Sequence, residues 1–254
     1  MKSVYGPVSS WRLGRSLGID PICSDKKICS FDCVYCQLGE GEKTYERREF
    51  VSLEKLKEDL KIIKDVKADV ITLSGTGEPT LAKNLREMVD YVRSISDLPL
   101  AILTNSSLLA EKEVRDVLYG LDIVVAKLDV SNENLFKDVN RPHGGISFDK
   151  YLESIKKFRE NYSGKFALQI MFVGENKKYV QDLANIVKEL DPDEVQINTP
   201  LRPCAVKPLS KEEILEVKNA FSDFKNVVSV YEAERPEVSP IDLNEIQKRK
   251  RPKP

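Results

Sequence analysis

The stretch "SLEKLKEDLKIIKDVKADVITLSGTGEP" (52–79) contains the unit from which most of the chain is built. Its first half predicts an amphipathic helix with Ser52 as N-cap, because apolar side chains recur at helical spacing, namely Leu53, Leu56, Leu60 and Ile63. Its second half holds a near-continuous apolar run, 69–74, as expected of a strand covered on both faces. A helix that leads into such a strand is one step of a parallel α/β sheet.

The same step recurs along the chain. Helices are expected near 82–96, 110–118, 147–160 and 177–190, and strands at 17–22, 69–74, 100–104, 122–129, 165–173 and 194–198. Six strands are fewer than the eight of a closed TIM barrel. The predicted fold is therefore α/β, a partial (β/α)6 TIM-type barrel with parallel strands plus a short C-terminal extension.

Two parts of the chain are expected. A core domain covers 1–200 and includes a cysteine loop at 23–40, and a C-terminal extension covers 201–254 and packs on the core until about 240. The extension shows a helical pattern near 210–223 and an apolar run at 227–231. Its basic end, "QKRKRPKP" (247–254), is interpreted as a solvated tail, with a contact to phosphate backbones as the alternative.

The composition describes a globular protein without a bias toward polyanions. Of 254 residues, 41% are hydrophobic and 32% charged, and the formal net charge is −1, so net charge does not support nucleic-acid binding. We expect no membrane segment and no signal peptide, because no apolar run is long enough for either. In the cytoplasm predicted on this ground, clustered cysteines hold metal or perform chemistry more often than they form disulfides.

Three of the five cysteines, Cys29, Cys33 and Cys36, lie within the eight residues "CSFDCVYC". A structural zinc site would need a fourth ligand, for which Cys23 and His143 are the candidates, and no second Cys-x-x-Cys unit exists. A [4Fe–4S] cluster with one iron left open suits three thiolates better. Polar loops follow the predicted strands and would share one face of a parallel sheet, namely "SGTGEP", "TNSS", "KLDVSN", "VGEN" and "NTPLRP".

The spacing Cys-x3-Cys-x2-Cys, with Tyr35 directly before the last cysteine and "GTGEP" after the next strand, resembles the radical S-adenosylmethionine (SAM) superfamily over roughly 15–200. The resemblance implies a [4Fe–4S] cluster on Cys29, Cys33 and Cys36. It also implies SAM on the open iron, an electron donor of the ferredoxin or flavodoxin type, and reductive cleavage of SAM to a 5′-deoxyadenosyl radical.

The resemblance further implies SAM contacts at successive strand ends. Tyr35 would lie against the adenine, and Gly75, Gly77 and Glu78 would meet the methionine amino group. The remaining contacts to the ribose, carboxylate or neighbouring atoms would come from Thr104, Asn105, Lys127, Asp129, Asn198 and Thr199. Ser106 stands where the family often has glycine. Lys127 and Asp129 could instead form an ion pair inside the barrel.

The flanking sequence resembles compact members grouped with the wyosine-base synthases, which modify tRNA. Two departures argue against copying that activity: only Cys23 and Cys204 remain for a second cluster, and no lysine matches the pyruvate-reactive one. We predict modification of tRNA or another phosphate-bearing substrate. Four arginines fall in loops near the predicted face and would suit a phosphate or carboxylate group, with surface or structural ion pairs as the alternative: Arg12, Arg15, Arg141 and Arg202. Cys204 is a candidate hydrogen donor or methyl acceptor, with a small apolar packing residue as the alternative. Trp11 could stack a base, with core or lid packing as the alternative.

Two other classes stay open from the sequence. One is a radical SAM enzyme of another kind: an activase that places a glycyl radical on a partner protein, or a small-molecule methylase or lyase. The other is not an enzyme but a zinc-bearing RNA-binding module that uses the three clustered cysteines and the basic tail.

Overall fold

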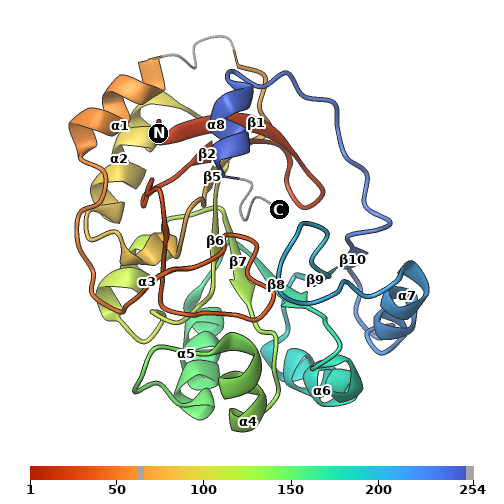
Figure 1. Cartoon of the computed structure of the whole chain (residues 1–254). Coiled ribbons are helices and arrows are strands. Elements are labelled where there is room, and N and C mark those ends of the chain that lie inside the picture. Colours follow the sequence, from red (N-terminus) through yellow and green to blue (C-terminus); the bar gives the residue numbers. More distant parts are fainter. Residues whose placement is uncertain (62–65, 250–254) are drawn as a thin grey trace.

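The computed structural model describes residues 1–61 and 66–249 and is built around one curled sheet (Figure 1). The sheet has eight strands in the order β1-β2-β5-β6-β7-β8-β9-β10. Seven of them run parallel, and β1 pairs antiparallel with β2 at one edge. The strands are β1 (Val4–Ser10), β2 (Gly14–Ile19), β5 (Val70–Leu73), β6 (Leu100–Thr104), β7 (Ile123–Lys127), β8 (Lys165–Met171), β9 (Glu194–Asn198) and β10 (Val227–Ser229).

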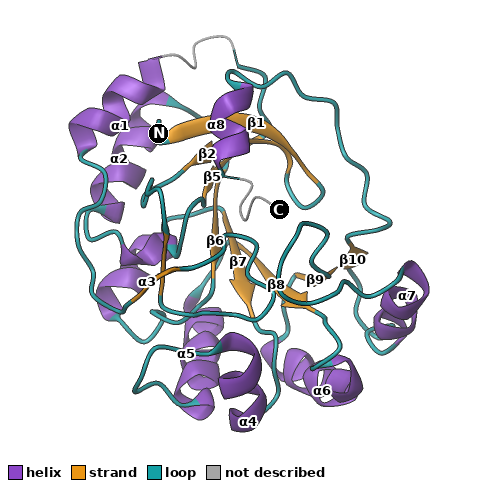
Figure 2. Ribbon diagram, viewed as in Figure 1, coloured by secondary structure: helices purple, strands orange, loops and turns teal. Residues whose placement is uncertain are grey.

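Helices cover the outer face of this sheet, and the strands lie inside the open arc that these helices form (Figure 2). The covering helices are α1 (Leu53–Leu60), α2 (Leu85–Ile95), α3 (Lys112–Leu118), α5 (Phe148–Asn161), α6 (Val180–Leu190) and α7 (Lys211–Asn219). Shorter pieces are 3-10 turns at Pro79–Leu81 and Lys177–Tyr179, α4 (Glu133–Leu135), a π-turn at Phe136–Asn140 and α8 (Leu243–Lys248), which contacts β1. No helix in the described part of the chain is long and apolar enough to span a bilayer.

The predicted partial parallel barrel is confirmed, and each of the six predicted strands is present. The strand expected at 17–22 ends earlier, at Ile19, and this sheet has two strands more than the predicted six. The first is β1, which contains Gly6 and Pro7; a proline is tolerated there because β1 is an edge strand whose outer donors need no partner. The second is β10, formed by the apolar run at 227–231. Residues 62–65 of the helix expected at 52–66 lie outside the described residues.

The segment after β10 returns to the opposite edge of the sheet. Ser9 Oγ donates to the Pro236 carbonyl at 2.7 Å, and the Ile241 N–H donates to the Gly6 carbonyl at 2.7 Å. The extension beyond residue 200 therefore contributes both an edge strand and a crossing segment that joins β10 to β1. Residues 250–254 of the basic tail are outside the described part of the chain.

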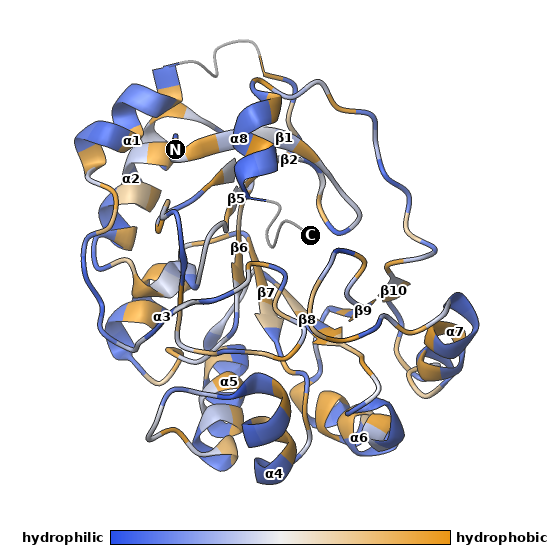
Figure 3. Ribbon diagram, in the orientation of Figure 1, coloured by the Kyte–Doolittle hydropathy of each residue, from blue (hydrophilic) through white to orange (hydrophobic). Residues whose placement is uncertain are grey.

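The hydrophobic core lies between the sheet and the helices, and the strands are its most apolar part (Figure 3). One cluster of rings lies below the cysteine loop. Phe136, fully buried, packs against Phe31 at 5.3 Å, Tyr151 at 4.9 Å and Phe148 at 6.0 Å between ring centroids. Because Phe31 sits between Cys29 and Cys33, this cluster fixes the cysteine loop to α5 and the π-turn.

Truncating the central ring of this cluster tests how much the cluster contributes to the stability of the fold. We expect Phe136→Ala to cost about 3–5 kcal/mol of unfolding free energy, as for other buried aromatic side chains. The measurement is urea unfolding followed by circular dichroism. Leu215→Ala, at an exposed position on α7, should stay within about 0.5 kcal/mol of the parent. Equal costs for the two variants would contradict the packing described here.

Candidate active site

The cysteine loop lies across the carboxyl ends of the central strands and is held there by backbone contacts. β3 (Lys27–Cys29) pairs with β4 (Gly41–Lys43), and Ile28 also forms a parallel bridge with Gly77. The Ile28 N–H donates to the Thr76 carbonyl at 3.2 Å, and the Glu78 N–H donates to the Ile28 carbonyl at 3.0 Å. The "SGTGEP" loop thus serves as the platform on which the first cysteine is placed.

Cys29, Cys33 and Cys36 line one cavity of about 210 Å³. The other walls come from the ends of four parallel strands and include several of the predicted site residues, namely Gly77, Glu78, Thr104, Asn105 and Lys127, together with Tyr35 from the cysteine loop. Sequence reasoning missed Gln169 and Met171 at the end of β8. Their alternation in "LQIM" was the available signal, since every second side chain of a strand faces the same side.

Two amide groups point at the cysteine sulfurs. Asn105 Nδ2 lies 3.4 Å from Cys29 Sγ, and Asn140 Nδ2 lies 3.5 Å from Cys33 Sγ. Burial, with the nearby Glu78 carboxylate, raises the pKa of the Cys29 thiol to about 12, and burial raises the pKa of Cys33 to about 11. A positive charge, such as iron, would offset the cost of deprotonating these buried thiols. The donor set therefore suits a metal centre that prefers soft thiolate ligands.

Gly75 and Gly77 are required by close packing. A Cβ on Gly75 would stand 2.0 Å from Cγ of the buried Asp20, and a Cβ on Gly77 would stand 1.7 Å from the Ile28 carbonyl oxygen. Both distances are far below van der Waals contact. The two glycines therefore let the loop approach β3 and the end of β2, and of the two only Gly77 lines the cysteine cavity.

The buried Glu78 carboxylate accepts hydrogen bonds from several neighbouring groups. Its Oε1 accepts hydrogen bonds from the Thr80 N–H, the Thr80 hydroxyl and the Thr104 hydroxyl, and its Oε2 accepts one from the Asn105 N–H at 2.7 Å. Burial nevertheless raises the pKa of this carboxyl. The side chain joins the end of β5 to the end of β6, and Oε2 keeps acceptor capacity toward the cavity.

Asp129 joins three elements in the same way. Its Oδ2 accepts from the Tyr35 hydroxyl and from Asn140 Nδ2 at 2.9 Å, and its Oδ1 accepts from the Met171 N–H at 2.7 Å. Lys127 Nζ lies 3.7 Å from Asp129 Oδ2 and 4.5 Å from the centroid of the Tyr35 ring. The ion pair considered from the sequence is present, and Lys127 faces the cysteine cavity whereas Asp129 is not among its described lining residues.

Ser106 adopts a left-handed backbone conformation, with φ at +68°. This is the region that glycine enters most easily, so the loop keeps the geometry expected of a glycine at this position. The neighbouring Asn105 side chain is fixed, because Asn105 Oδ1 accepts from the Ser107 N–H at 3.0 Å and Asn105 Nδ2 donates to Ser30 Oγ at 2.8 Å.

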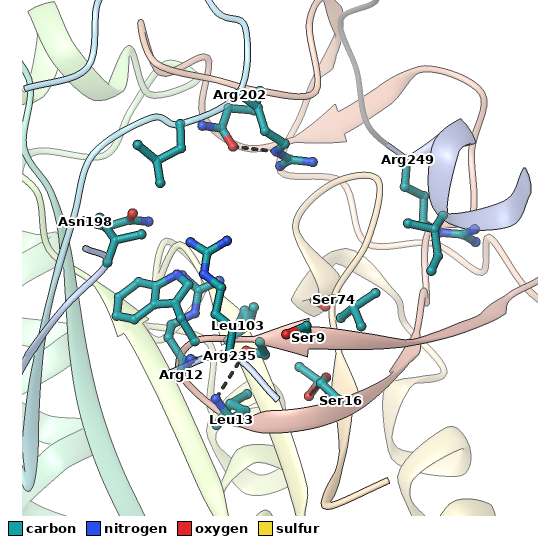
Figure 4. Close-up of a pocket in the computed structure, with 18 of the residues that line it drawn as sticks. Ser9, Arg12, Leu13, Ser16, Ser74, Leu103, Asn198, Arg202, Arg235 and Arg249 are labelled. Atoms are coloured by element: carbon teal, nitrogen blue, oxygen red, sulfur yellow. Dashed lines mark hydrogen bonds between the residues drawn. The ribbon is translucent and has the colours of Figure 1, made fainter. Parts of the chain in front are cut away.

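A second, larger cavity of about 410 Å³ lies inside the curled sheet, between β1–β2 and the loop after β9 (Figure 4). Its lining includes Gly75, Asn198 and Thr199, which therefore stand apart from the cysteines, and also Trp11, Arg12 and Arg202. Arg235, which sequence reasoning missed, joins them from the segment after β10. The four residues shared by both cavities are Gln37, Leu38, Leu103 and Arg202.

The remaining candidates lie elsewhere. Arg15 forms a forked ion pair with Asp69, its Nε 3.1 Å from both carboxylate oxygens, and Arg141 is exposed. Cys204 Sγ donates to the Val206 carbonyl at 3.2 Å, and Cys23 Sγ lies 3.8 Å from Nη2 of Arg249. None of these four is among the described residues that line either cavity. The hydrogen-donor role of Cys204 stays a prediction.

Comparison with known proteins agrees with this architecture. The Radical SAM superfamily profile matches residues 26–187. A UPF0026 protein of Methanocaldococcus jannaschii is 38% identical over 90% of this chain and 73% of its own length. The chain belongs to the radical SAM superfamily and, within it, to the UPF0026 family.

Solved structures share the fold at low sequence identity. SuiB of Streptococcus suis, determined with SAM bound, has a TM-score of 0.65 at 14% identity, and the alignment covers 85% of this chain but 50% of SuiB. TYW1 with a lysine–pyruvate adduct has a TM-score of 0.56 at 17% identity, with 82% of this chain and 73% of TYW1 covered. Family membership makes the protein a radical SAM enzyme, with SAM and an iron–sulfur cluster as its cofactors.

The contact between Ile28 and Gly77 can be tested by adding one methyl group. Gly77→Ala places a Cβ against backbone, so we expect a loss of about 1–3 kcal/mol and poor retention of iron, because Cys29 follows Ile28 directly. Thermal unfolding and iron per chain after reconstitution are the measurements. Gly144→Ala is the control, since nothing lies within 4 Å of its Cβ. Normal stability and iron content in Gly77→Ala would refute the close contact.

Proposed function

We propose that Cys29, Cys33 and Cys36 hold a [4Fe–4S] cluster whose remaining iron binds SAM, and that the enzyme modifies a phosphate-bearing substrate. One observation carries the proposal: the three thiols and the polar ends of four strands border the same cavity, which adjoins an arginine-lined one. When bound, these cofactors supply a 5′-deoxyadenosyl radical, after one-electron reduction by a donor of the ferredoxin or flavodoxin type.

The chain's own residues would bind and orient SAM. Asn105 and Lys127 face the cysteine cavity and offer an amide and a cation to the ribose and carboxylate. Tyr35 is held by Asp129, so its ring and backbone keep a fixed place beside Cys36. Glu78 and Asp129 act chiefly by positioning these groups, because each already accepts several hydrogen bonds.

A zinc-bearing module fits the same cysteines less well. Zinc needs four ligands about 2.0–2.3 Å from one point. In residues 1–61 and 66–249, no group of three or more His, Cys, Asp or Glu side chains is arranged to hold a single ion. The thiols border a cavity instead, which suits a cluster that presents a separate iron to each of them.

The neighbouring arginines support the proposed class of phosphate-bearing substrates, of which tRNA is one member. The grouping with the wyosine-base synthases remains a proposal, which the shared fold of TYW1 supports. Cys23 and Cys204 lie in separate environments, and Lys27 Nζ, buried, is already paired with Asp32. A second cluster and a reactive lysine of that kind therefore find no support here. A reducing cytoplasm suits the free thiols and the cluster.

Single substitutions of the three cysteines test the proposal. We expect Cys29→Ala, Cys33→Ala and Cys36→Ala each to abolish release of 5′-deoxyadenosine from SAM with dithionite under anaerobic conditions, because each removes a cluster ligand. Release is measured by chromatography and mass spectrometry, with iron per chain measured in parallel.

Cys23→Ala is the matched control, since this thiol lines neither cavity among the described residues. It should keep iron and SAM cleavage near the parent level. The proposal is wrong if the parent protein, reconstituted and brown, cleaves no SAM, or if a cluster-cysteine variant cleaves it as well as Cys23→Ala does. Incubation with RNA or metabolite extract, followed by mass spectrometry, then separates tRNA from other substrates.

A further inference from the structure

The cavity inside the curled sheet carries a concentration of positive charge that SAM chemistry does not account for. Figure 4 shows Arg12, Arg202 and Arg235 directed toward one space, with Arg249 on the far side. The three come from distant parts of the chain: the β1–β2 turn, the loop after β9 and the segment after β10. The fold brings these three arginines together, so no short sequence motif could have predicted the site.

These three guanidinium groups lack acidic partners. No Asp or Glu of residues 1–61 or 66–249 forms an ion pair with Arg12, Arg202 or Arg235, whereas Arg249 in the same wall pairs with Asp20 at 3.3 Å and Glu245 at 3.2 Å. Arg249 is thus a structural clamp between α8 and the end of β2. The other three leave an uncompensated charge in a concave site.

Arg12 shows the cost of this arrangement. Its Nε is buried without a hydrogen-bond partner, and its guanidinium stacks 4.8 Å from the centroid of the Trp11 ring. Burial and the like charges of Arg202 and Arg235 lower the pKa of Arg12 to about 10. Like charges held together in one concave site are stabilised when an anion enters.

We propose that this cavity binds the phosphate group of a small phosphorylated substrate through Arg12, Arg202 and Arg235. The inference deepens the proposed function and rests on it for the chemistry that follows binding. Three guanidinium forks suit the three oxygens and double charge of a phosphate monoester better than a single carboxylate. Arg202 also lines the cysteine cavity, so a phosphate held here places the rest of the substrate beside the SAM site.

A small molecule fits better than RNA on three grounds. The cavity, about 410 Å³, lies within the sheet and has the size of an ordinary small-molecule site. The walls offer hydroxyl groups that suit a sugar or another polar body, from Ser9, Ser10, Ser16, Thr72 and Ser74. The net charge of −1 also gives a polyanion no general attraction to the protein.

Trp11 provides the readout, because it is the only tryptophan in the chain and lines the cavity. Its fluorescence is followed in the full-length protein, without SAM, during titration with pyrophosphate and with ribose 5-phosphate at constant ionic strength. We expect a saturable change with both compounds and none with ribose. Bulk yeast tRNA at equal phosphate concentration should give no comparable saturable change.

Variants connect the signal to the arginines. Arg202 and Arg235 are exposed, so neither Arg202→Gln nor Arg235→Gln should impair folding. Each variant should weaken binding about tenfold or more, since each removes a charge-assisted contact. Arg15→Gln, an arginine paired with Asp69 away from the cavity, should bind within about twofold of the parent. Calorimetry of the same titrations checks that the fluorescence reports binding.

The proposal is overturned if phosphate compounds give no saturable signal, if both cavity variants bind like Arg15→Gln, or if ribose binds as well as ribose 5-phosphate. Tighter binding of tRNA that is lost in the same two variants would overturn the small-substrate assignment. None of these titrations uses the cluster or SAM. Failure here therefore leaves the 5′-deoxyadenosine assay unaffected, and failure of that assay leaves the phosphate titrations interpretable.

Discussion

The bridge between Ile28 and Gly77 is the contact on which the rest of the site depends. It pins the start of the cysteine loop to the end of β5 by two backbone hydrogen bonds, and it is possible only because residue 77 has no Cβ. Asp20 reinforces it, since its carboxylate accepts from the backbone of Ile22, Cys23 and Thr76. Backbone contacts thus place Cys29, the first cysteine of the loop.

Two buried carboxylates hold the walls of the resulting cavity together. Glu78 ties β5 to β6 and Asp129 ties β7 to β8 and to the cysteine loop, and each does so through several short polar contacts in a buried setting. Buried charges of this kind are tolerated only when donors satisfy them. The hydrogen bonds that satisfy these carboxylates also make the strand ends rigid. Rigid strand ends suit a site that must hold a reactive species away from water.

Much of this could be read from the sequence, because local patterns encode it. Helical spacing and buried apolar runs predict the βα units, and the cysteine spacing with "GTGEP" indicates the family. The edge strand β1 was missed since Gly6 and Pro7 obscure its period, and the roles of Gly75 and Gly77 could not be known without their neighbours. Arg235 was missed because only the crossing segment after β10, fixed by Pro236 and Ile241, brings it to the cavity.

The proposed chemistry requires iron held by three thiolates with a position left for SAM. Electron paramagnetic resonance of the reconstituted, dithionite-reduced protein, recorded with and without SAM, tests this directly. The account predicts the signal of a reduced [4Fe–4S] cluster whose g-values change when SAM is added. A cluster signal that SAM leaves unchanged, or a colourless protein that holds stoichiometric zinc, would contradict it.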